Sequence, residues 1–181
     1  VSLVELKERM RTTIKLDFEV ERMEPLFADK KAYDDFIARH DKATVKKGDL
    51  ATYKGNCYMG IDAGSTTTKV ALVAEDGTLL YSFYDNNNGS PLATSIRAIT
   101  DKLPEDVHIV RSCSTGYGEA LIKSALMLDE GEVETVSHYY AAAFFDPEVD
   151  CILDIGGQDM KCIKIKDHTV DGVQLNEACS S

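Results

Sequence analysis

An apolar run that carries an aspartate near its end and leads into glycine occurs twice in this chain. This repeat limits the possible folds more than any other feature. Residues 57–61 lead into Asp62-Ala63-Gly64, and residues 151–155 contain Asp154 and lead into Gly156-Gly157. In both copies a second strand-like run follows the turn, where many nucleotide-binding folds have a helix. Each copy therefore predicts a β-hairpin with an aspartate near the end of its first strand.

The rest of the C-terminal two thirds alternates between strands and helices. Apolar periodicity, an Asp76-Gly77 turn and a Ser90-Pro91 helix start define the expected elements. Strands are expected at 57–61, 67–74, 78–84, 107–112, 151–155, 160–166 and 169–175, and helices at 91–103, 119–128 and 136–145. Three strands joined by tight turns come first, and helix, strand, helix and strand follow. This order predicts an α/β fold, a ribonuclease-H-like lobe whose mixed sheet has three antiparallel strands, added parallel strands and flanking helices.

Residues 1–55 differ from the rest of the chain in composition and periodicity. They are charged and show helical periodicity, most clearly at 29–40, where Tyr33, Phe36 and Ile37 share one face. Nothing in this segment resembles a site. We predict a helical N-terminal appendage or linker at 1–55 and the lobe at 56–181.

The charge balance restricts the possible partners. The chain has 31 acidic and 20 basic residues and a formal net charge of −11. Such a surface repels phosphate backbones and anionic membranes, so we expect neither nucleic-acid nor membrane binding. No apolar run reaches the roughly 20 residues of a membrane-spanning helix, and no signal peptide is recognisable. A cytoplasmic location is expected.

Five cysteines occur without Cys-x-x-Cys spacing, so neither a disulfide framework nor a zinc finger is indicated. Cys57, Cys151 and Cys162 lie in or beside apolar strand-like runs, where a thiol is expected to be a small buried side chain. Cys179 differs, because its neighbours are small or polar.

The first hairpin turn has the composition of a phosphate-binding loop. Gly64 lets backbone N–H groups approach a phosphate, and Ser65, Thr66 and Thr67 add hydroxyl donors, with Lys69 nearby. Asp62 is suited to hold a hydrated magnesium ion. An ordinary hairpin with a left-handed glycine explains this turn alone equally well.

The second turn repeats the pattern and makes that plain explanation weaker. Asp154 offers a second magnesium ligand, Gly156 and Gly157 offer backbone N–H groups, and Gln158 can orient a water or a magnesium ligand. The Gly-x-x-x-x-Gly-Lys-Ser/Thr loop is absent, and both turns lead into strands, which excludes a dinucleotide fingerprint. Two such hairpins suggest a grip on phosphates and magnesium from opposite sides.

Glu134 precedes a predicted helix, where an acid either polarises an attacking water or stabilises the helix start. Both explanations remain open. His138 in that helix is expected to be a packed or solvent-facing side chain. The turn Thr115-Gly116-Tyr117-Gly118 is expected to shape the entrance of the next helix, with no assigned role.

Four motifs together resemble one family. They are GIDAGSTTTK at 60–69, STGYG at 114–118, DIGGQDMK at 154–161 and LNEACSS at 175–181. In this order they resemble the activators of 2-hydroxyacyl-CoA dehydratases and the related ATPase subunits of benzoyl-CoA reductase. That family lies within the superfamily of actin, sugar kinases and heat-shock chaperones. The resemblance covers residues 56–181.

The resemblance implies cofactors and partners. Members bind ATP with Mg²⁺ in each subunit of a homodimer, share a 4Fe-4S cluster, and pass an electron to a partner acyl-CoA dehydratase or reductase. Carried over by motif, Asp62 and Asp154 would organise magnesium. Ser65, Thr66, Thr67 and the amides of 156–157 would contact phosphates. Cys179 would be a cluster ligand in the intact protein.

The resemblance also implies that residues 56–181 are a first lobe that stops before the second. We therefore expect this chain alone to bind ATP weakly, to be inactive, and to lack a cluster. A second activase domain of the same chain is an alternative dimer partner. Two other functions stay open: a sugar or amino-sugar kinase of the same fold, and a non-catalytic regulatory ATP-binding domain.

Overall fold

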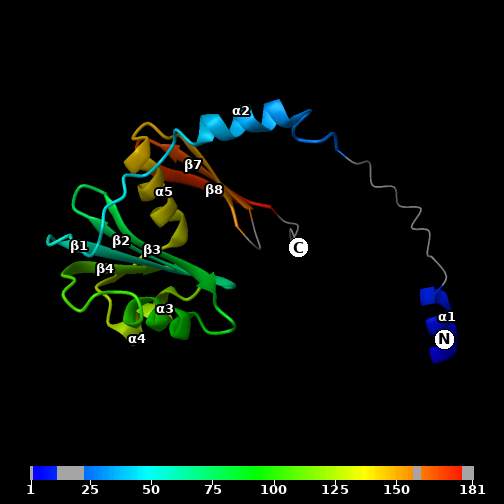
Figure 1. Cartoon of the computed structure of the whole chain (residues 1–181), viewed down its shortest axis with the longest axis horizontal. Helices are drawn as coiled ribbons and strands as arrows, with labels where there is room; N and C mark the ends of the chain where they lie inside the picture. Colours follow the sequence, from blue (N-terminus) through cyan, green and yellow to red (C-terminus); the bar gives the residue numbers. More distant parts are fainter. Residues whose placement is uncertain (1, 12–22, 157–159, 177–181) are drawn as a thin grey trace. The chain divides into compact units, whose positions relative to one another are not determined.

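A computed structural model describes residues 2–11, 23–156 and 160–176 (Figure 1). Residues 1–44 and 45–181 form two compact units. The first unit contains helices α1 (Leu3–Arg11) and α2 (Lys30–His40), neither of which buries a residue. Asp29 caps α2 by accepting a hydrogen bond of 2.8 Å from the Ala32 N–H. None of the described helices is long and apolar enough to cross a membrane.

The second unit contains a five-stranded mixed sheet of order β3-β2-β1-β4-β5. Its strands are β1 (Cys57–Ala63), β2 (Thr67–Ala74), β3 (Leu79–Asn86), β4 (Ile109–Thr115) and β5 (Glu130–Gly131). β1–β2 and β2–β3 pair antiparallel, whereas β1–β4 and β4–β5 pair parallel. The predicted fold class, an α/β lobe with a mixed sheet, is confirmed.

Alternating side chains of β1 and β2 build the core. Met59, Ile61, Val70 and Leu72 are buried in one cluster, as the period of two along a strand requires. Helices α3 (Pro91–Thr100) and α4 (Glu119–Leu126) cover this face of the sheet and add their own buried side chains (Figure 1). Ser90 caps α3 by accepting from the Ala93 N–H at 3.2 Å, as its position before Pro91 predicted.

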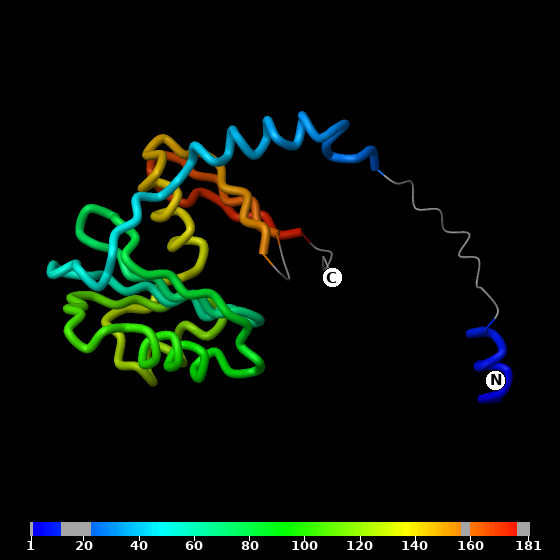
Figure 2. Tube along the Cα trace, viewed as in Figure 1, coloured from blue at the N-terminus to red at the C-terminus, as the bar shows by residue number. Residues whose placement is uncertain are grey.

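The last three strands form a sheet of their own. Strands β6 (Cys151–Ile155), β7 (Met160–Lys166) and β8 (Thr169–Leu175) pair antiparallel in the order β6-β7-β8. Helix α5 (Glu134–Phe145) packs on one face of this sheet (Figure 2). There the Tyr139 hydroxyl donates to the His168 carbonyl at 2.8 Å. The sequence predicted these strands, but it counted 151–155 among the parallel strands of the mixed sheet, and this was wrong. β6 pairs antiparallel in the second sheet, and the short strand β5, which was not predicted, takes the parallel edge of the first sheet.

Residues 45–55, grouped with the N-terminal segment in the sequence analysis, belong to the second unit. The Gly48 N–H donates to the Leu79 carbonyl and the Leu79 N–H donates to the Lys46 carbonyl, each at 2.9 Å. A short parallel bridge therefore adds Lys47 to the start of β3.

The expectation for the cysteines was correct only in part. Cys57 is buried at 1% exposure and Cys162 is half-buried, but Cys151 is exposed. Cys151 shares the outer face of the three-stranded sheet with Leu153 and Ile155, which are 71% and 75% exposed. Since α5 covers the opposite face, an apolar run did not guarantee burial here.

Candidate nucleotide-binding site

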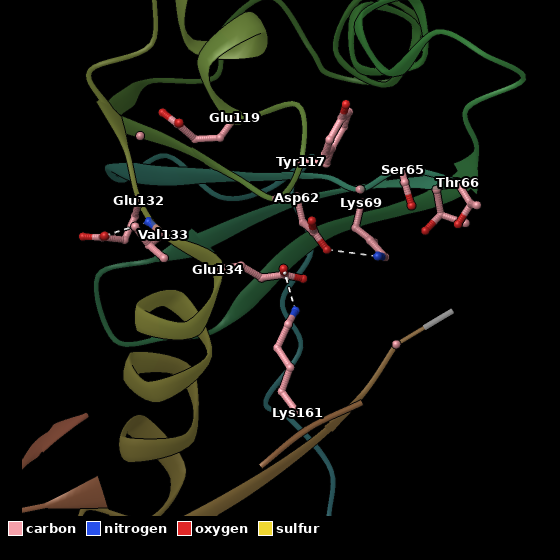
Figure 3. A pocket seen from close by; sticks show the side chains of 15 residues that line it. Asp62, Ser65, Thr66, Lys69, Tyr117, Glu119, Glu132, Val133, Glu134 and Lys161 are labelled. Atoms are coloured by element: carbon pink, nitrogen blue, oxygen red, sulfur yellow. Dashed lines mark hydrogen bonds and ion pairs between the residues drawn. The ribbon is translucent and has the colours of Figure 1, made fainter. Parts of the chain in front are cut away.

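A cavity of about 690 Å³ lies where the first hairpin turn, the start of α5 and the β6–β7 hairpin meet (Figure 3). That size falls within the range of small-molecule sites. It is lined by Asp62, Gly64, Ser65, Thr66, Thr67, Lys69, Gly116, Tyr117, Glu119, Gly131, Glu132, Val133, Glu134, Gly156 and Lys161. The lining therefore includes six of the predicted site residues from the first turn, together with Glu134 and Gly156.

The first turn is closed by a hydrogen bond of 3.0 Å from the Gly64 N–H to the Thr67 carbonyl. Ser65 and Thr66 at its tip are exposed, while the following Thr68 is fully buried. The turn is therefore fixed at its base and presents hydroxyl groups at its tip.

Asn87 holds this turn in place, and the sequence analysis did not identify it. Its side-chain amide donates to the Gly64 carbonyl at 2.7 Å, and its Oδ1 accepts from the Thr68 hydroxyl at 2.5 Å. Its own backbone N–H donates to the Thr66 carbonyl at 2.8 Å. Asn87 is only 3% exposed, so it acts as a buried support for the loop. Because Asn87 lies in a run of three asparagines at the end of a predicted strand, the sequence analysis treated it as an ordinary turn residue.

A second segment, Thr115-Gly116-Tyr117-Gly118, packs directly under Asp62. Gly116 has φ of +86°, and a Cβ at this position would fall 2.6 Å from Asp62 Oδ1. The Gly118 N–H donates to the Ala63 carbonyl at 2.8 Å. The glycines expected to shape a helix entrance therefore also shape the wall behind the first aspartate.

The two carboxylate oxygens of Asp62 differ, because one accepts a hydrogen bond and the other has no partner among the described residues. Its Oδ2 accepts from Lys69 Nζ at 2.9 Å, and the two side chains are 28% and 42% exposed. Its Oδ1 is buried and has no hydrogen-bond partner among the described residues. A buried carboxylate oxygen without a partner is costly, and a bound cation or its water would satisfy it.

The other predicted carboxylates meet at one lysine. Lys161 Nζ lies 2.9 Å from Glu134 Oε2 and 3.5 Å from Asp154 Oδ2, and its side chain is 12% exposed. On the other side, His138 Nδ1 lies 3.2 Å from the same Asp154 oxygen. Antiparallel pairing of Asp154 with Lys161 and the start of α5 bring these groups together. His138, expected to be packed or solvent-facing, is half-buried and contacts the predicted site residue Asp154.

Glu134, His138 and Asp154 offer ligand atoms that all lie within 4.8 Å of one another. The single Lys161 ammonium already lies within ion-pair distance of both carboxylates, however, so a cation would compete with it for this cluster. Asp154 does not line the cavity itself. Lys161, which lies 3.5 Å from the Asp154 carboxylate, does line the cavity.

Gly156 lies at the start of the second turn and lines the cavity. Gly157 and Gln158, the other predicted residues of this turn, lie outside the described residues, as does Cys179.

The lining chemistry suits a polyphosphate with a divalent cation. The lining includes four acidic residues, Asp62, Glu119, Glu132 and Glu134, and two lysines, Lys69 and Lys161. Hydroxyls and a glycine turn supply neutral donors for phosphate oxygens, and the excess of carboxylates favours a cation beside them. Hairpins from two separate sheets and the start of α5 frame this one cavity, an arrangement of the actin-like ATPase fold.

Comparisons with known proteins agree with this class. Residues 59–181 match the BadF/BadG/BcrA/BcrD ATPase family. The chain is 30% identical over 128 residues to the (R)-2-hydroxyglutaryl-CoA dehydratase activating ATPase of Acidaminococcus fermentans. That match covers 68% of this chain and 48% of the relative. The chain belongs to the BadF/BadG/BcrA/BcrD ATPase family.

Two solved structures resemble the fold. The crystal structure of component A of the Acidaminococcus fermentans (R)-2-hydroxyglutaryl-CoA dehydratase matches with a TM-score of 0.58 at 25% identity, over 70% of this chain and 49% of that one. The activator of the 2-hydroxyisocaproyl-CoA dehydratase from Clostridium difficile, with bound ADPNP, matches with a TM-score of 0.53 at 25% identity, over 66% and 45%. The chain spans about half the length of the relatives it matches.

Proposed function

We propose that the cavity binds ATP with Mg²⁺, and that this chain is the nucleotide-binding part of an activator of a 2-hydroxyacyl-CoA dehydratase or related reductase. The observation that carries the proposal is the buried, unpartnered Asp62 Oδ1 beside a glycine and hydroxyl turn. Family membership supports the ATPase class, and a structural relative contains ADPNP, an ATP analogue.

In this proposal the first turn binds phosphate oxygens through the N–H groups and hydroxyls of residues 64–67, and Lys69 adds a positive charge. Gly156, Gly157 and Gln158 act from the second turn. Asp62 Oδ1 has the environment of a ligand to a hydrated cation, and magnesium there would screen the phosphate charge. Gly116 keeps the space beside that oxygen free of side-chain atoms.

Glu134 is proposed to accept a proton from the attacking water. In the structure its Oε2 is held by Lys161 at 2.9 Å. Lys161 lines the cavity, so a phosphate oxygen entering the cavity would compete with the Glu134 carboxylate for the Lys161 ammonium. Transfer of Lys161 to the phosphate would release Glu134 as a base and Asp154 as the second magnesium ligand. His138 would then keep Asp154 oriented.

We also propose a division of the chain into an N-terminal appendage and an ATPase lobe. Residues 1–44 are a helical appendage or linker, shorter than the 1–55 expected from the sequence because residues 45–55 belong to the second unit, and residues 56–181 contribute one lobe of an activase-type ATPase domain. A further lobe in a longer protein would complete the nucleotide cleft. The proposal is supported by the match, which covers only 48% of the Acidaminococcus relative.

The finer proposal is electron transfer. In the intact protein Cys179 is a ligand of a 4Fe-4S cluster shared in a homodimer or with a second activase domain. ATP hydrolysis then drives an electron from it to the acyl-CoA partner. Support comes from the Asn176-Glu177-Ala178-Cys179 motif and from the names of the relatives. An anaerobically purified full-length protein should give a reduced iron–sulfur resonance that responds to nucleotide and is lost in Cys179→Ala.

Calorimetric titration with ADPNP, with and without Mg²⁺, tests nucleotide binding. Asp62→Asn should remove most of the magnesium-dependent gain in affinity, because it removes the charge at the unpartnered oxygen. Asp171→Asn, at an exposed position on β8, is the matched control and should bind like the parent. Equal affinity with and without Mg²⁺ in the parent would refute the magnesium site. Phosphoryl transfer to an amino sugar would replace the activator by a kinase, and binding without turnover by the full-length protein would indicate a regulatory domain.

A further inference from the structure

Two thiols lie side by side on the outer face of the three-stranded sheet. The Sγ atoms of Cys151 and Cys162 are 3.7 Å apart, and both cysteines are free. Neither lines the cavity, and the two proposed site residues that these strands carry, Asp154 and Lys161, lie on the opposite face.

Strand register explains why they meet. Cys151 pairs with Lys164 and Cys162 pairs with Leu153, so the two cysteines are diagonal neighbours on adjacent antiparallel strands. Side chains at 151, 153 and 155 of β6 share a face with that of 162 on β7, because side chains alternate along each strand. The right-handed twist of a hairpin shortens one of its diagonals and brings such a pair into contact.

The pair is also accessible. Cys151 is exposed, its neighbours Leu153 and Ile155 are largely exposed, and Cys162 is half-buried. Cys57, in contrast, is buried at 1% exposure. A hydrogen bond with Cys162 raises the pKa of the Cys151 thiol, which slows its attack at neutral pH without preventing it.

We propose that Cys151 and Cys162 are a reversible dithiol that closes to an intrachain disulfide by exchange with a small-molecule disulfide such as oxidised glutathione. One cysteine thiolate attacks a sulfur of the small disulfide, which expels one glutathione thiolate and leaves a mixed disulfide. The second cysteine thiolate then attacks the protein sulfur and expels the second glutathione thiolate. The two cysteine protons pass to solvent or to the departing thiolates, so the protein loses two hydrogens and two glutathione molecules are formed.

The second step is fast relative to the first because both sulfurs are already in contact. Closure brings the sulfurs from 3.7 Å to about 2.05 Å, which requires rotation of both side chains and a small increase in strand twist. The cross-link then restrains β6 against β7, the strands that carry Asp154 and Lys161 on the other face.

Peptide mapping tests this directly, since trypsin cuts after Lys161, between the two cysteines. The reduced protein is incubated with oxidised glutathione, alkylated and digested. Peptides 124–161 and 162–164 are expected as one species that separates on reduction. Amide hydrogen exchange within 151–166 should also be slower after oxidation.

The exposed-site variant Cys151→Ser should leave Cys162 as a stable glutathione adduct and abolish both effects. Cys113→Ser, on β4, should leave both unchanged. The proposal is wrong if the parent carries separate glutathione adducts on Cys151 and Cys162. It is also wrong if its disulfide joins other cysteines or two chains. None of these readouts depends on nucleotide binding, so their failure is distinct from failure of the proposed function.

Discussion

The backbone of Gly116 lies against the carboxylate of Asp62, so closely that a Cβ at 116 would fall 2.6 Å from Asp62 Oδ1. The two residues are far apart in sequence and meet because β1 and β4 run parallel, with Asp62 opposite Thr115. The space beside the unpartnered oxygen therefore depends on a glycine in the left-handed region.

Gly116→Ala should damage both the fold and the site. The strained φ and the contact with Asp62 together should lower the free energy of unfolding by about 1–3 kcal/mol. Nucleotide affinity should fall because the carboxylate must move. Chemical denaturation and ADPNP titration measure the two effects. Gly172→Ala is the control, since a Cβ there meets nothing within 4 Å. A stable Gly116→Ala protein with normal affinity would contradict this account.

Asn87→Ala should loosen the first turn. Removing the side chain leaves the Gly64 carbonyl and the Thr68 hydroxyl without their buried partner, which costs about 1–3 kcal/mol for each unsatisfied group. We expect lower thermal stability and weaker nucleotide binding. Asn86→Ala, at the exposed neighbouring position, should change neither. Equal melting temperatures for the two variants would show that Asn87 does not support the turn.

Lys161→Met should separate the two roles of this lysine. Without its ammonium group, Glu134 loses its ion pair and Asp154 keeps only its contact with His138, so stability should fall by about 1–3 kcal/mol. ADPNP affinity should fall at least about tenfold, equivalent to about 1.4 kcal/mol, if Lys161 moves to the phosphate. Lys164→Met removes an exposed lysine from the outer face of the same strand and serves as the control. Loss of stability with unchanged affinity would leave Lys161 a purely structural residue.

Acid stability should depend on Asp129. Hydrogen bonds from the hydroxyl and the backbone N–H of Ser112, both 2.7 Å, hold the pKa of Asp129 below its usual range. A lowered folded-state pKa adds stability that is fully present above the unfolded value of about 3.9 and is lost as pH falls through the folded value. Asp129→Asn should therefore flatten the acid limb of stability against pH. Ser112→Ala removes the hydroxyl that donates to the Asp129 carboxylate and accepts from the Asp129 N–H, but it keeps the Ser112 backbone N–H donor, so it should have a smaller effect on the pH dependence in the same direction. Parallel curves for the parent and Asp129→Asn would contradict the prediction.

Local sequence was sufficient for features that neighbouring residues determine. The start of α3 follows from the Ser90 side chain and the fixed φ of Pro91, and the turn before β3 follows from Asp76-Gly77. The first phosphate turn could be recognised because its aspartate, glycine and hydroxyls are consecutive. Each of these depends on short-range sterics and hydrogen bonds, which the sequence states directly.

Tertiary structure alone decided which distant groups meet. Lys161 joins Glu134 to Asp154 only because β7 pairs with β6 and α5 packs on both, and Asn87 reaches Gly64 across 23 positions. The division into two sheets likewise left Cys151 exposed on a face that its apolar run did not distinguish from a core. Periodicity identifies which side chains share a face, but only packing determines whether that face is covered and which remote residues it contacts.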